Sequence, residues 1–293
     1  AASDVYKRQG GGGLYGPANE IYLKVGDKTI PLSGKWKYKI SASNSDFDFV
    51  EYGPNAYPSL LYNAMVNPLV GLSMQGVIWY QGENNTNRAK EYYHLFPAMI
   101  NDWRKKWGKD FPFYWVQLAN YMDAVEVPSE SLWAQVREAQ TQTLSLSHTG
   151  QAVIIDIGEA KDIHPKNKQE VGRRLALHAL HNDYGFSDVV CESPMPKTVR
   201  RVQDKIVVQF DNVADGLIVK NKYGYLMSFA VAGNDGVYKW VQAKVAGKDR
   251  VVLSCPDVID PVSVRYAWGD NPDDANLYNS VGLPATPFEI KIE

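Results

Sequence analysis

The chain has 293 residues, a formal net charge of −2, a hydrophobic fraction of 45% and a charged fraction of 22%. These values are ordinary for a globular protein and allow one large domain or two modest ones. The charge gives no reason to expect nucleic acid or an anionic membrane as a partner, and no apolar run approaches the roughly 18 residues of a membrane-spanning helix.

The chain opens on a stretch without regular pattern. Residues 1–9 show neither a helix nor a strand period, and a run of glycines, Gly10–Gly13, follows them. No basic region followed by an apolar core marks a signal peptide. We therefore predict that residues 1–13 are a disordered or non-native start.

A short β segment is expected next. Residues 19–40 alternate apolar and polar side chains around a turn signal at Gly26-Asp27, which predicts paired strands. Residues 41–57 are rich in Ser, Asn, Asp and Gly and are predicted to be a loop. We group residues 14–57 as one segment.

From residue 58 to residue 196, predicted strands alternate with predicted helices. Helices are expected to begin near residues 58, 89, 131 and 167, and strands at residues 76–80, 112–118 and 151–157. The longest helix, residues 89–107, carries apolar side chains at helical spacing. This alternation predicts an α/β domain with a parallel sheet, and the near-continuous apolar strands are typical of a sheet covered by helices on both faces.

The helical signal ends at Pro194-Met195-Pro196. Short strand-like runs separated by turn residues then predict an all-β, sandwich-like module over residues 197–293. The runs are residues 205–210, 217–220, 228–232, 237–245, 250–254 and 262–268. The two cysteines, Cys191 and Cys255, are expected to be unpaired core residues.

Polar side chains follow two of the predicted parallel strands. Gln81, Gly82, Glu83 and Asn84 come directly after residues 76–80, and a loop with Asp162 and His164 follows residues 151–157. Ligands of parallel α/β sheets bind beyond the carboxyl ends of the strands. We therefore expect the two loops to form one site.

His164 is the strongest candidate for a catalytic group. It lies just before a helix that Asn167 is expected to cap, with Glu170 as the capping-box partner. A neutral imidazole there can act as a general base, and Asp162 can orient it. A lone Asp-x-His pair is, however, more often an ordinary turn.

The loop at residues 81–84 offers a second set of groups. A Gln81 amide can donate to a developing oxyanion, and glycine at position 82 lets the backbone approach a substrate. Glu83 could orient His164 in place of Asp162 or bind a sugar hydroxyl. The alternative is a polar loop that caps the next helix. No set of His, Cys and carboxylate residues has metal-ligand spacing, so neither a metal nor a cofactor is expected.

Several sequence blocks together resemble the sialate O-acetylesterase family, a branch of the SGNH hydrolases related to acetylxylan esterases. The blocks are Tyr62-Asn63-Ala64-Met65, Pro68-Leu69, GVIWYQGENN at 76–85, FPFYWVQLA at 111–119, DIHPKNKQEVGRRLA at 162–176 and VRYAWGDNPDDANLYNSVGLPATPF at 264–288. The resemblance covers most of residues 14–288 and implies an SGNH-hydrolase-like, flavodoxin-like parallel sheet with flanking helices.

The resemblance implies acetyl-ester hydrolysis on an acetylated carbohydrate, through an acyl-serine intermediate. His164 matches the family's base and Asp162 its likeliest acid. Other SGNH enzymes place the acid three residues before the histidine, where this chain has Lys161, so the acid stays open between Asp162 and Glu83. Gln81, Gly82 and Gln117 match pocket or oxyanion positions.

The family's nucleophile lies in a Gly-Gln-Ser-Asn-Met block, which does not occur in this sequence. Ser59 and Ser73 lack that motif. The resemblance therefore implies a sheet that is incomplete at the N-terminus, a chain that begins inside an inserted β segment at residues 14–57, and a fragment inactive alone.

The alternatives are an acetylxylan esterase of the same class and a non-catalytic carbohydrate-binding protein. The resemblance also suggests a periplasmic or secreted protein.

Overall fold

The structure, a computed structural model, describes residues 17–35, 53 and 57–293. Contacts divide the chain into two units, residues 1–68 and residues 69–293. In the first unit, β1 (Tyr22–Val25) and β2 (Lys28–Pro31) form an antiparallel hairpin. This confirms the predicted strands on either side of the Gly26-Asp27 turn, and Gly26 has the positive φ of 58° that such a turn favours.

The rest of the first unit is described only in part. The helix expected from residue 58 is a short helical segment, η3 (Tyr62–Val66), followed by η4 (Asn67–Leu69), which ends at the start of the second unit. The predictions for residues 1–13 and for most of residues 36–56 fall outside the described residues.

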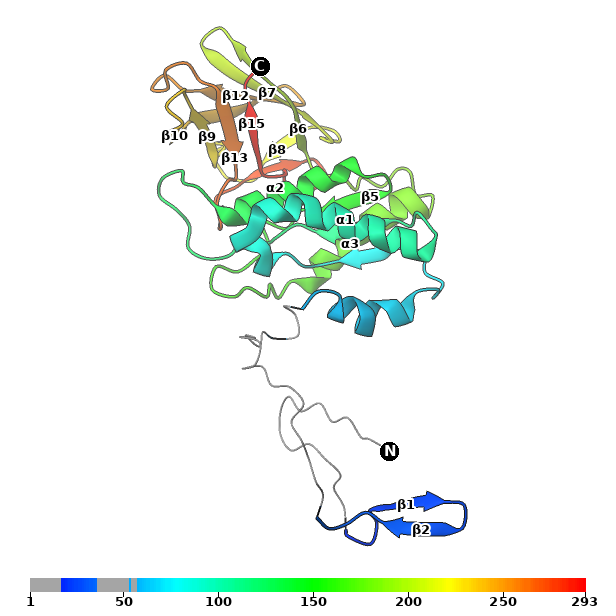
Figure 1. Ribbon diagram of the computed structural model, residues 1–293. Helices are drawn as coiled ribbons and strands as arrows, with labels where there is room; N and C mark the ends of the chain where they lie inside the picture. Colours follow the sequence, from blue (N-terminus) through cyan, green and yellow to red (C-terminus); the bar gives the residue numbers. More distant parts are fainter. Residues whose placement is uncertain (1–16, 36–52, 54–56) are drawn as a thin grey trace. The chain divides into compact units, whose positions relative to one another are not determined.

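The second unit begins with a three-stranded parallel sheet. Its strands are β3 (Val77–Trp79), β4 (Phe113–Val116) and β5 (Thr149–Ala152), in the order β3-β4-β5. Three helices flank it, α1 (Ala89–Trp107), α2 (Leu132–Gln142) and α3 (Lys168–Asp183) (Figure 1). The short turn η5 (Glu83–Arg88) precedes α1, and η6 (Thr143–Ser145) follows α2. This confirms the predicted α/β class.

The side chains of β4 explain why helices cover both faces. Phe113 and Trp115 point to one face, where they pack with α1 and α2. Tyr114 and Val116 point to the other face, where they pack with α3. Every residue of β4 is buried, as expected for a central strand that is apolar on both faces.

Strand β3 differs from β4, because in the described part of the chain it pairs on one side only. Val77 and Trp79 pack against the α1–α2 core, whereas Ile78, which points to the opposite face, is 70% exposed. An unpaired edge with an apolar side chain is a surface that can add another strand.

The C-terminal part is a sandwich of two antiparallel sheets. One sheet has the order β10 (Tyr238–Trp240), β9 (Phe229–Ala232), β13 (Ser263–Tyr266), β15 (Phe288–Lys291). The other has the order β11 (Gln242–Ala246), β12 (Arg250–Ser254), β7 (Lys205–Asp211), β6 (Met195–Val202). A short pair, β8 (Leu217–Val219) with β14 (Leu277–Asn279), accompanies them. One core fills the space between the sheets, with Phe210 and Phe288 meeting across it at 6.0 Å between ring centroids.

The structure corrects several element boundaries. The run at residues 237–245 is two strands, β10 and β11, which belong to different sheets and separate at Val241. Strand β6 was not predicted, because it is an edge strand with Pro196 and exposed basic side chains, both of which edges tolerate. Strand β5 ends at Ala152, earlier than residue 157.

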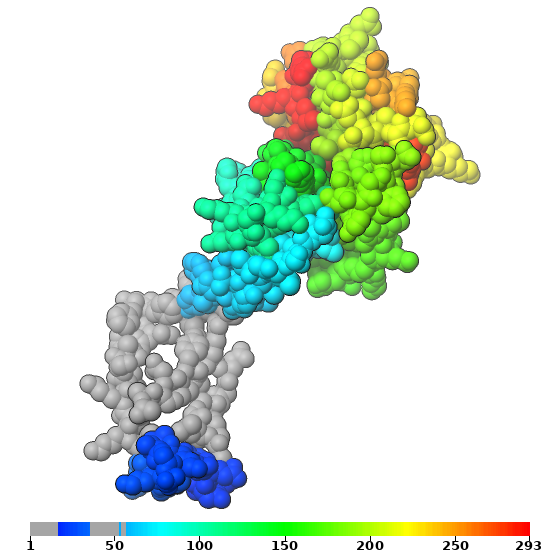
Figure 2. All heavy atoms as spheres, turned by 90° about the vertical axis from the view of Figure 1, so that its right-hand side faces the viewer, coloured from blue at the N-terminus to red at the C-terminus, as the bar shows by residue number. Residues whose placement is uncertain are grey.

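The α/β region and the sandwich meet along a buried contact. Val153 and Ile155, just beyond β5, belong to the sandwich core. Arg137 of α2 has no exposed surface and donates to the carbonyls of Leu118 (2.8 Å), Ala119 (2.7 Å), Gly269 (2.5 Å) and Asp270 (2.9 Å). In the space-filling view the two regions adjoin (Figure 2). The predicted boundary between residues 196 and 197 stays a prediction.

Among the helices of the described residues, none combines the length and apolar character that crossing a bilayer requires.

Candidate active site

The loop after β3 is held in place by the side chain of Gln81. Its Oε1 accepts a hydrogen bond from the Tyr92 hydroxyl (3.0 Å), and its Nε2 donates to Asn85 Oδ1 (2.7 Å). Its backbone carbonyl accepts from Gln140 Nε2 of α2 (3.2 Å). The Gln81 amide is therefore committed to the loop itself, and the predicted role as an oxyanion donor would require it to leave Asn85.

Gly82 is buried and has a φ of 148°, a conformation that residues with a side chain rarely adopt. A Cβ at this position would lie 3.2 Å from both Gln140 Nε2 and Leu118 Cδ2. Glycine is therefore required because the backbone at position 82 packs closely against α2 and against the segment just after β4. It sets the direction of η5, which begins with Glu83.

The loop after β5 is fixed at its start and along its length. Gly158 N donates to Asn120 Oδ1 (2.7 Å), and a Cβ on Gly158 would lie 2.2 Å from the Asn120 carbonyl oxygen. Glu159 Oε2 accepts from Lys166 Nζ (3.0 Å), which closes the loop around Asp162 and His164.

One pocket brings the two loops together. It has a volume of about 340 Å³ and is lined by Tyr80, Glu83, Ile163, His164 and Lys168. The expected meeting of the two strand ends therefore holds for Glu83 and His164. Serine, threonine and cysteine are missing from this lining in the described part of the chain.

Asp162 lies beside His164 without lining the pocket. Its Oδ1 accepts a hydrogen bond from the backbone N–H of His164 (2.9 Å) and lies 3.8 Å from Nδ1 of the imidazole. That separation is longer than a hydrogen bond, so a small side-chain rotation is needed to make one. The His164 side chain is 87% exposed, which leaves its imidazole open to an incoming group.

Tyr80 and Lys168 are pocket residues that the sequence analysis missed. The Tyr80 hydroxyl is buried and has no hydrogen-bond partner within the described residues. Burial, helped by the charge of Glu83, raises the pKa of Tyr80 to about 12. Lys168 Nζ lies 4.6 Å from the centre of the Tyr80 ring, a cation–π distance. The position of Tyr80, one residue before Gln81 at a strand end, was the available signal.

Two other predicted site residues do not line this pocket. Asn84 is exposed in η5. Gln117 has no exposed surface, and its Nε2 donates to the Arg137 carbonyl (3.2 Å) and to Thr141 Oγ1 (2.9 Å). Gln117 connects β4 to α2 in the core, so its match to a binding position in the family does not place its side chain in the pocket.

The helix behind His164 is anchored by charge pairs. Asn167 caps α3 by accepting a hydrogen bond from Glu170 N (3.2 Å), as predicted. The Glu170 carboxylate binds Arg173 and Arg174, and these arginines, chiefly Arg173, lower the pKa of Glu170 to about 2. Arg174 also makes two hydrogen bonds to Asp156, of 2.6 and 2.9 Å. This network fixes the end of the His164 loop.

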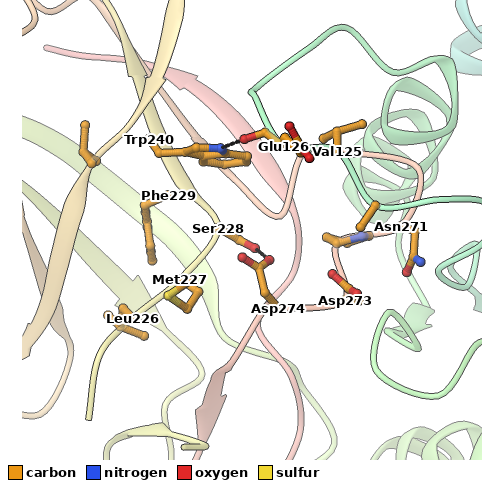
Figure 3. A pocket seen from close by; sticks show the side chains of 14 residues that line it. Val125, Glu126, Leu226, Met227, Ser228, Phe229, Trp240, Asn271, Asp273 and Asp274 are labelled. Carbon is orange, nitrogen blue, oxygen red and sulfur yellow. Dashed lines mark hydrogen bonds between the residues drawn. The ribbon is translucent and has the colours of Figure 1, made fainter. Parts of the chain in front are cut away.

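A second hollow of about 340 Å³ lies between residues 124–126 and the sandwich (Figure 3). Its polar groups bind one another: Trp240 Nε1 donates to the Glu126 carbonyl (2.9 Å), and Ser228 bonds to Asp274. Among the described residues, its lining includes no histidine. The pocket with His164 is therefore the better candidate for catalysis.

Comparisons with known proteins indicate what the chain is similar to. Residues 45–181 match the family model of carbohydrate esterases described as sialic acid-specific acetylesterases. The sialate O-acetylesterases of Rattus norvegicus and Homo sapiens are both 31% identical to this chain, over 83% and 80% of its length. These alignments cover 50% and 49% of the relatives, so the chain spans about half the length of the curated relatives it matches.

A solved structure extends the match to three dimensions. The crystal structure of a carbohydrate acetylesterase from Xanthomonas citri is 45% identical in sequence and superposes with a TM-score of 0.76. The alignment covers 80% of this chain and 55% of that one. The pocket residues Tyr80, Glu83, Ile163, His164 and Lys168 all lie within the range of the family model. The chain is therefore similar to carbohydrate esterases of the sialic acid-specific acetylesterase family over most of its length.

Proposed function

We propose that the protein is a carbohydrate O-acetylesterase that hydrolyses acetyl esters of sialic acids or related acetylated sugars. The observation that carries the proposal is the pocket in which Glu83 and His164, from two different strand ends, meet in a chain similar to that family. Asp162, beside His164, supplies a carboxylate that can orient the imidazole.

In the proposed reaction, His164 removes the proton from a serine hydroxyl as the oxygen attacks the acetyl carbonyl carbon. The tetrahedral intermediate expels the sugar oxygen, which takes the proton from His164 and leaves an acetyl-serine. Water, deprotonated by His164, then attacks the acetyl group and releases acetate and free serine. In the proposal, the serine belongs to a Gly-Gln-Ser-Asn-Met block, which this sequence does not contain.

We assign the orienting carboxylate to Asp162, because its Oδ1 lies 3.8 Å from His164 Nδ1 and a rotation of the side chain can close that gap. Glu83 is assigned to a sugar hydroxyl, since it lines the pocket. Gln81 and Gly82 support the position of Glu83 through their contacts with α2. Asn84, exposed in the same turn, is proposed as a further contact of the sugar.

The test compares histidine variants in a protein that also carries the Gly-Gln-Ser-Asn-Met block, with release of acetate from an O-acetylated sialic acid as the readout. His164→Ala is expected to abolish turnover. His148→Ala is the matched control, since His148 is also exposed and also lies beside an aspartate, Asp110, at 3.0 Å. Equal rates for the two variants would overturn the assignment of His164.

The carboxylate is tested in the same assay. Asp162→Asn is expected to lower kcat by about 10²- to 10⁴-fold, the usual scale for a lost acid–base function. Glu83→Gln is expected to raise KM more than it lowers kcat. The reverse pattern would exchange the two roles.

The alternatives predict different outcomes. An acetylxylan esterase would release acetate faster from acetylated xylan than from acetylated sialic acid. A carbohydrate-binding protein would bind the acetylated sugar at equilibrium without releasing acetate, and His164→Ala would not change any hydrolysis.

A further inference from the structure

Three side chains from two segments meet at α3, away from the pocket. His178 lies on α3, and Cys191 and Glu192 lie in the connection that leads to β6. One ligand atom from each of them lies within 4.8 Å of the other two. Their spacing in the sequence, twelve residues between His178 and Cys191, did not suggest a site, because helix α3 and the turn after it separate them.

One nitrogen of the His178 imidazole makes a hydrogen bond, and the other has no hydrogen-bond partner among the described residues. Nε2 lies 3.1 Å from the carbonyl oxygen of Gln151, which can only accept, so Nε2 carries the proton. Nδ1 is then an acceptor; it is buried and has no hydrogen-bond partner among the described residues. His178 itself has no exposed surface. Leaving such a group unsatisfied destabilises the fold, so a missing partner is expected.

The ring cannot easily turn away from this arrangement. Tyr114 stacks on it, with 5.5 Å between ring centroids and 24° between the planes. A Cβ on Gly150 would lie 2.5 Å from His178 Nδ1, so glycine at this position of β5 leaves room for the imidazole. A histidine whose second nitrogen is fixed by a carbonyl is the usual arrangement of a metal ligand.

The distances also suit a metal ion. His178 Nδ1 and Glu192 Oε1 are 3.7 Å apart, too far for a hydrogen bond. Two such ligands, each about 2.1 Å from a tetrahedral zinc ion, are separated by roughly 3.4 Å. Cys191 is a free, buried thiol, and thiolate with imidazole is a ligand set that zinc favours.

We propose that His178, Cys191 and Glu192 form a binding site for a divalent transition metal of the zinc type. The Glu192 side chain is 39% exposed, which leaves an entry path and room for water as a fourth ligand. His178 lies ten residues beyond Lys168 on α3, about 15 Å along the helix, so the metal is separate from the His164 pocket.

The site connects the two regions of the second unit. The Glu192 carbonyl accepts a hydrogen bond from Asn279 Nδ2 of the sandwich (3.1 Å), while His178 and Gln151 belong to the α/β region. A bound ion would therefore link the segment that carries Cys191 and Glu192 to α3. Since the ion binds the folded chain, it raises the melting temperature.

The experiment uses the full 293-residue chain after treatment with a chelator. Zn²⁺ is titrated by calorimetry, and Co²⁺ by absorption, where a thiolate ligand gives a charge-transfer band. We expect one equivalent of either ion to bind, a thiolate band with Co²⁺, and a higher melting temperature with Zn²⁺. A folded wild-type chain that binds no zinc stoichiometrically would overturn the proposal.

Two conservative variants and one control locate the ion. Cys191→Ser is expected to remove the thiolate band and weaken zinc binding at least tenfold. Glu192→Gln, at a partly exposed position where folding is not at risk, is expected to weaken it about tenfold while keeping the band. Cys255→Ser, which alters the other buried cysteine, in the sandwich core, is expected to bind like the wild type. Equal affinity in all three variants would place the ion elsewhere and refute the site.

Discussion

The two regions of the second unit bury the faces of their β-sheets in different ways. In the sandwich, each sheet covers the other, and one continuous core lies between them. In the α/β region, α1 and α2 cover one face of the sheet and α3 covers β4 and β5 on the other, while Ile78 of β3 stays exposed. The region that carries the pocket is thus the more open one. A shared apolar core holds the two sheets of the sandwich together, whereas the α/β region also depends on polar anchors such as Arg137 and Glu170.

The largest effect is expected from Arg137, which couples the two regions. Arg137→Met removes a buried cation that satisfies four carbonyls, and we expect it to lower the free energy of unfolding by about 3 to 5 kcal/mol. The measurement is urea denaturation followed by both fluorescence and circular dichroism. The wild type should unfold in one transition, and the variant in two.

The control for this prediction is Arg88→Met. Arg88 is exposed and pairs only weakly with Glu91, at 3.8 Å, so its replacement should change stability by less than about 0.5 kcal/mol. A single, unshifted transition in Arg137→Met would mean that the two regions do not depend on this contact.

Glu170 should make the stability of the α/β region depend on pH. Its folded-state pKa, about 2, lies below the ordinary value, so its ion pairs stabilise the fold fully above about pH 4.5. This stabilisation shrinks as the pH falls and is lost as the pH passes through about 2. Because Glu170 is partly exposed, we expect Glu170→Gln to lower the free energy of unfolding at pH 7 by only about 1 to 2 kcal/mol.

Urea denaturation at pH 7, 4 and 3 measures the difference in free energy of unfolding between the wild type and Glu170→Gln. This difference should become smaller as the pH falls. Glu91→Gln is the control, since its pair with Arg88 is exposed and long. A gap between Glu170→Gln and the wild type that stays constant over this range would show that the carboxylate acts through packing and not through charge.

The open edge at β3 should promote self-association of the chain. Ile78→Lys places a charge on the exposed position of that edge and is expected to weaken association about tenfold, without loss of fold. Sedimentation equilibrium gives the association constant. Val127→Lys, at a loop residue 68% exposed, is the matched control and should leave association unchanged. A wild-type chain that stays monomeric at all concentrations would contradict this prediction.

The smallest effect concerns this chain's own hydrolysis of aryl acetates. We expect the 293-residue chain to react no faster than its His164→Ala variant, because the lining of the described pocket offers no serine for the imidazole to activate. Turnover that disappears when Ser59 or Ser73 is replaced by alanine would show that one of these serines is the nucleophile.

Much of the α/β region could be predicted, because its elements are long and strongly periodic. Helix α1 spans Ala89–Trp107 as expected, and α3 begins at the predicted Asn167 cap. The sandwich was harder to predict, because its strands are short and their partners are distant in the sequence. No local pattern marks Val241 as the point where the chain changes sheets.

The sequence by itself determined the class of each region, the two polar strand ends and the residues Glu83, Asp162 and His164, since periodicity and strand-end position are local properties. Only the tertiary structure decided which polar groups are free to act. Gln81 and Gln117 are polar in the sequence, yet their amides are bound within the loop and the core. His178, Cys191 and Glu192 gave no sequence signal, because only folding brings one ligand atom of each of them to within 4.8 Å of the other two.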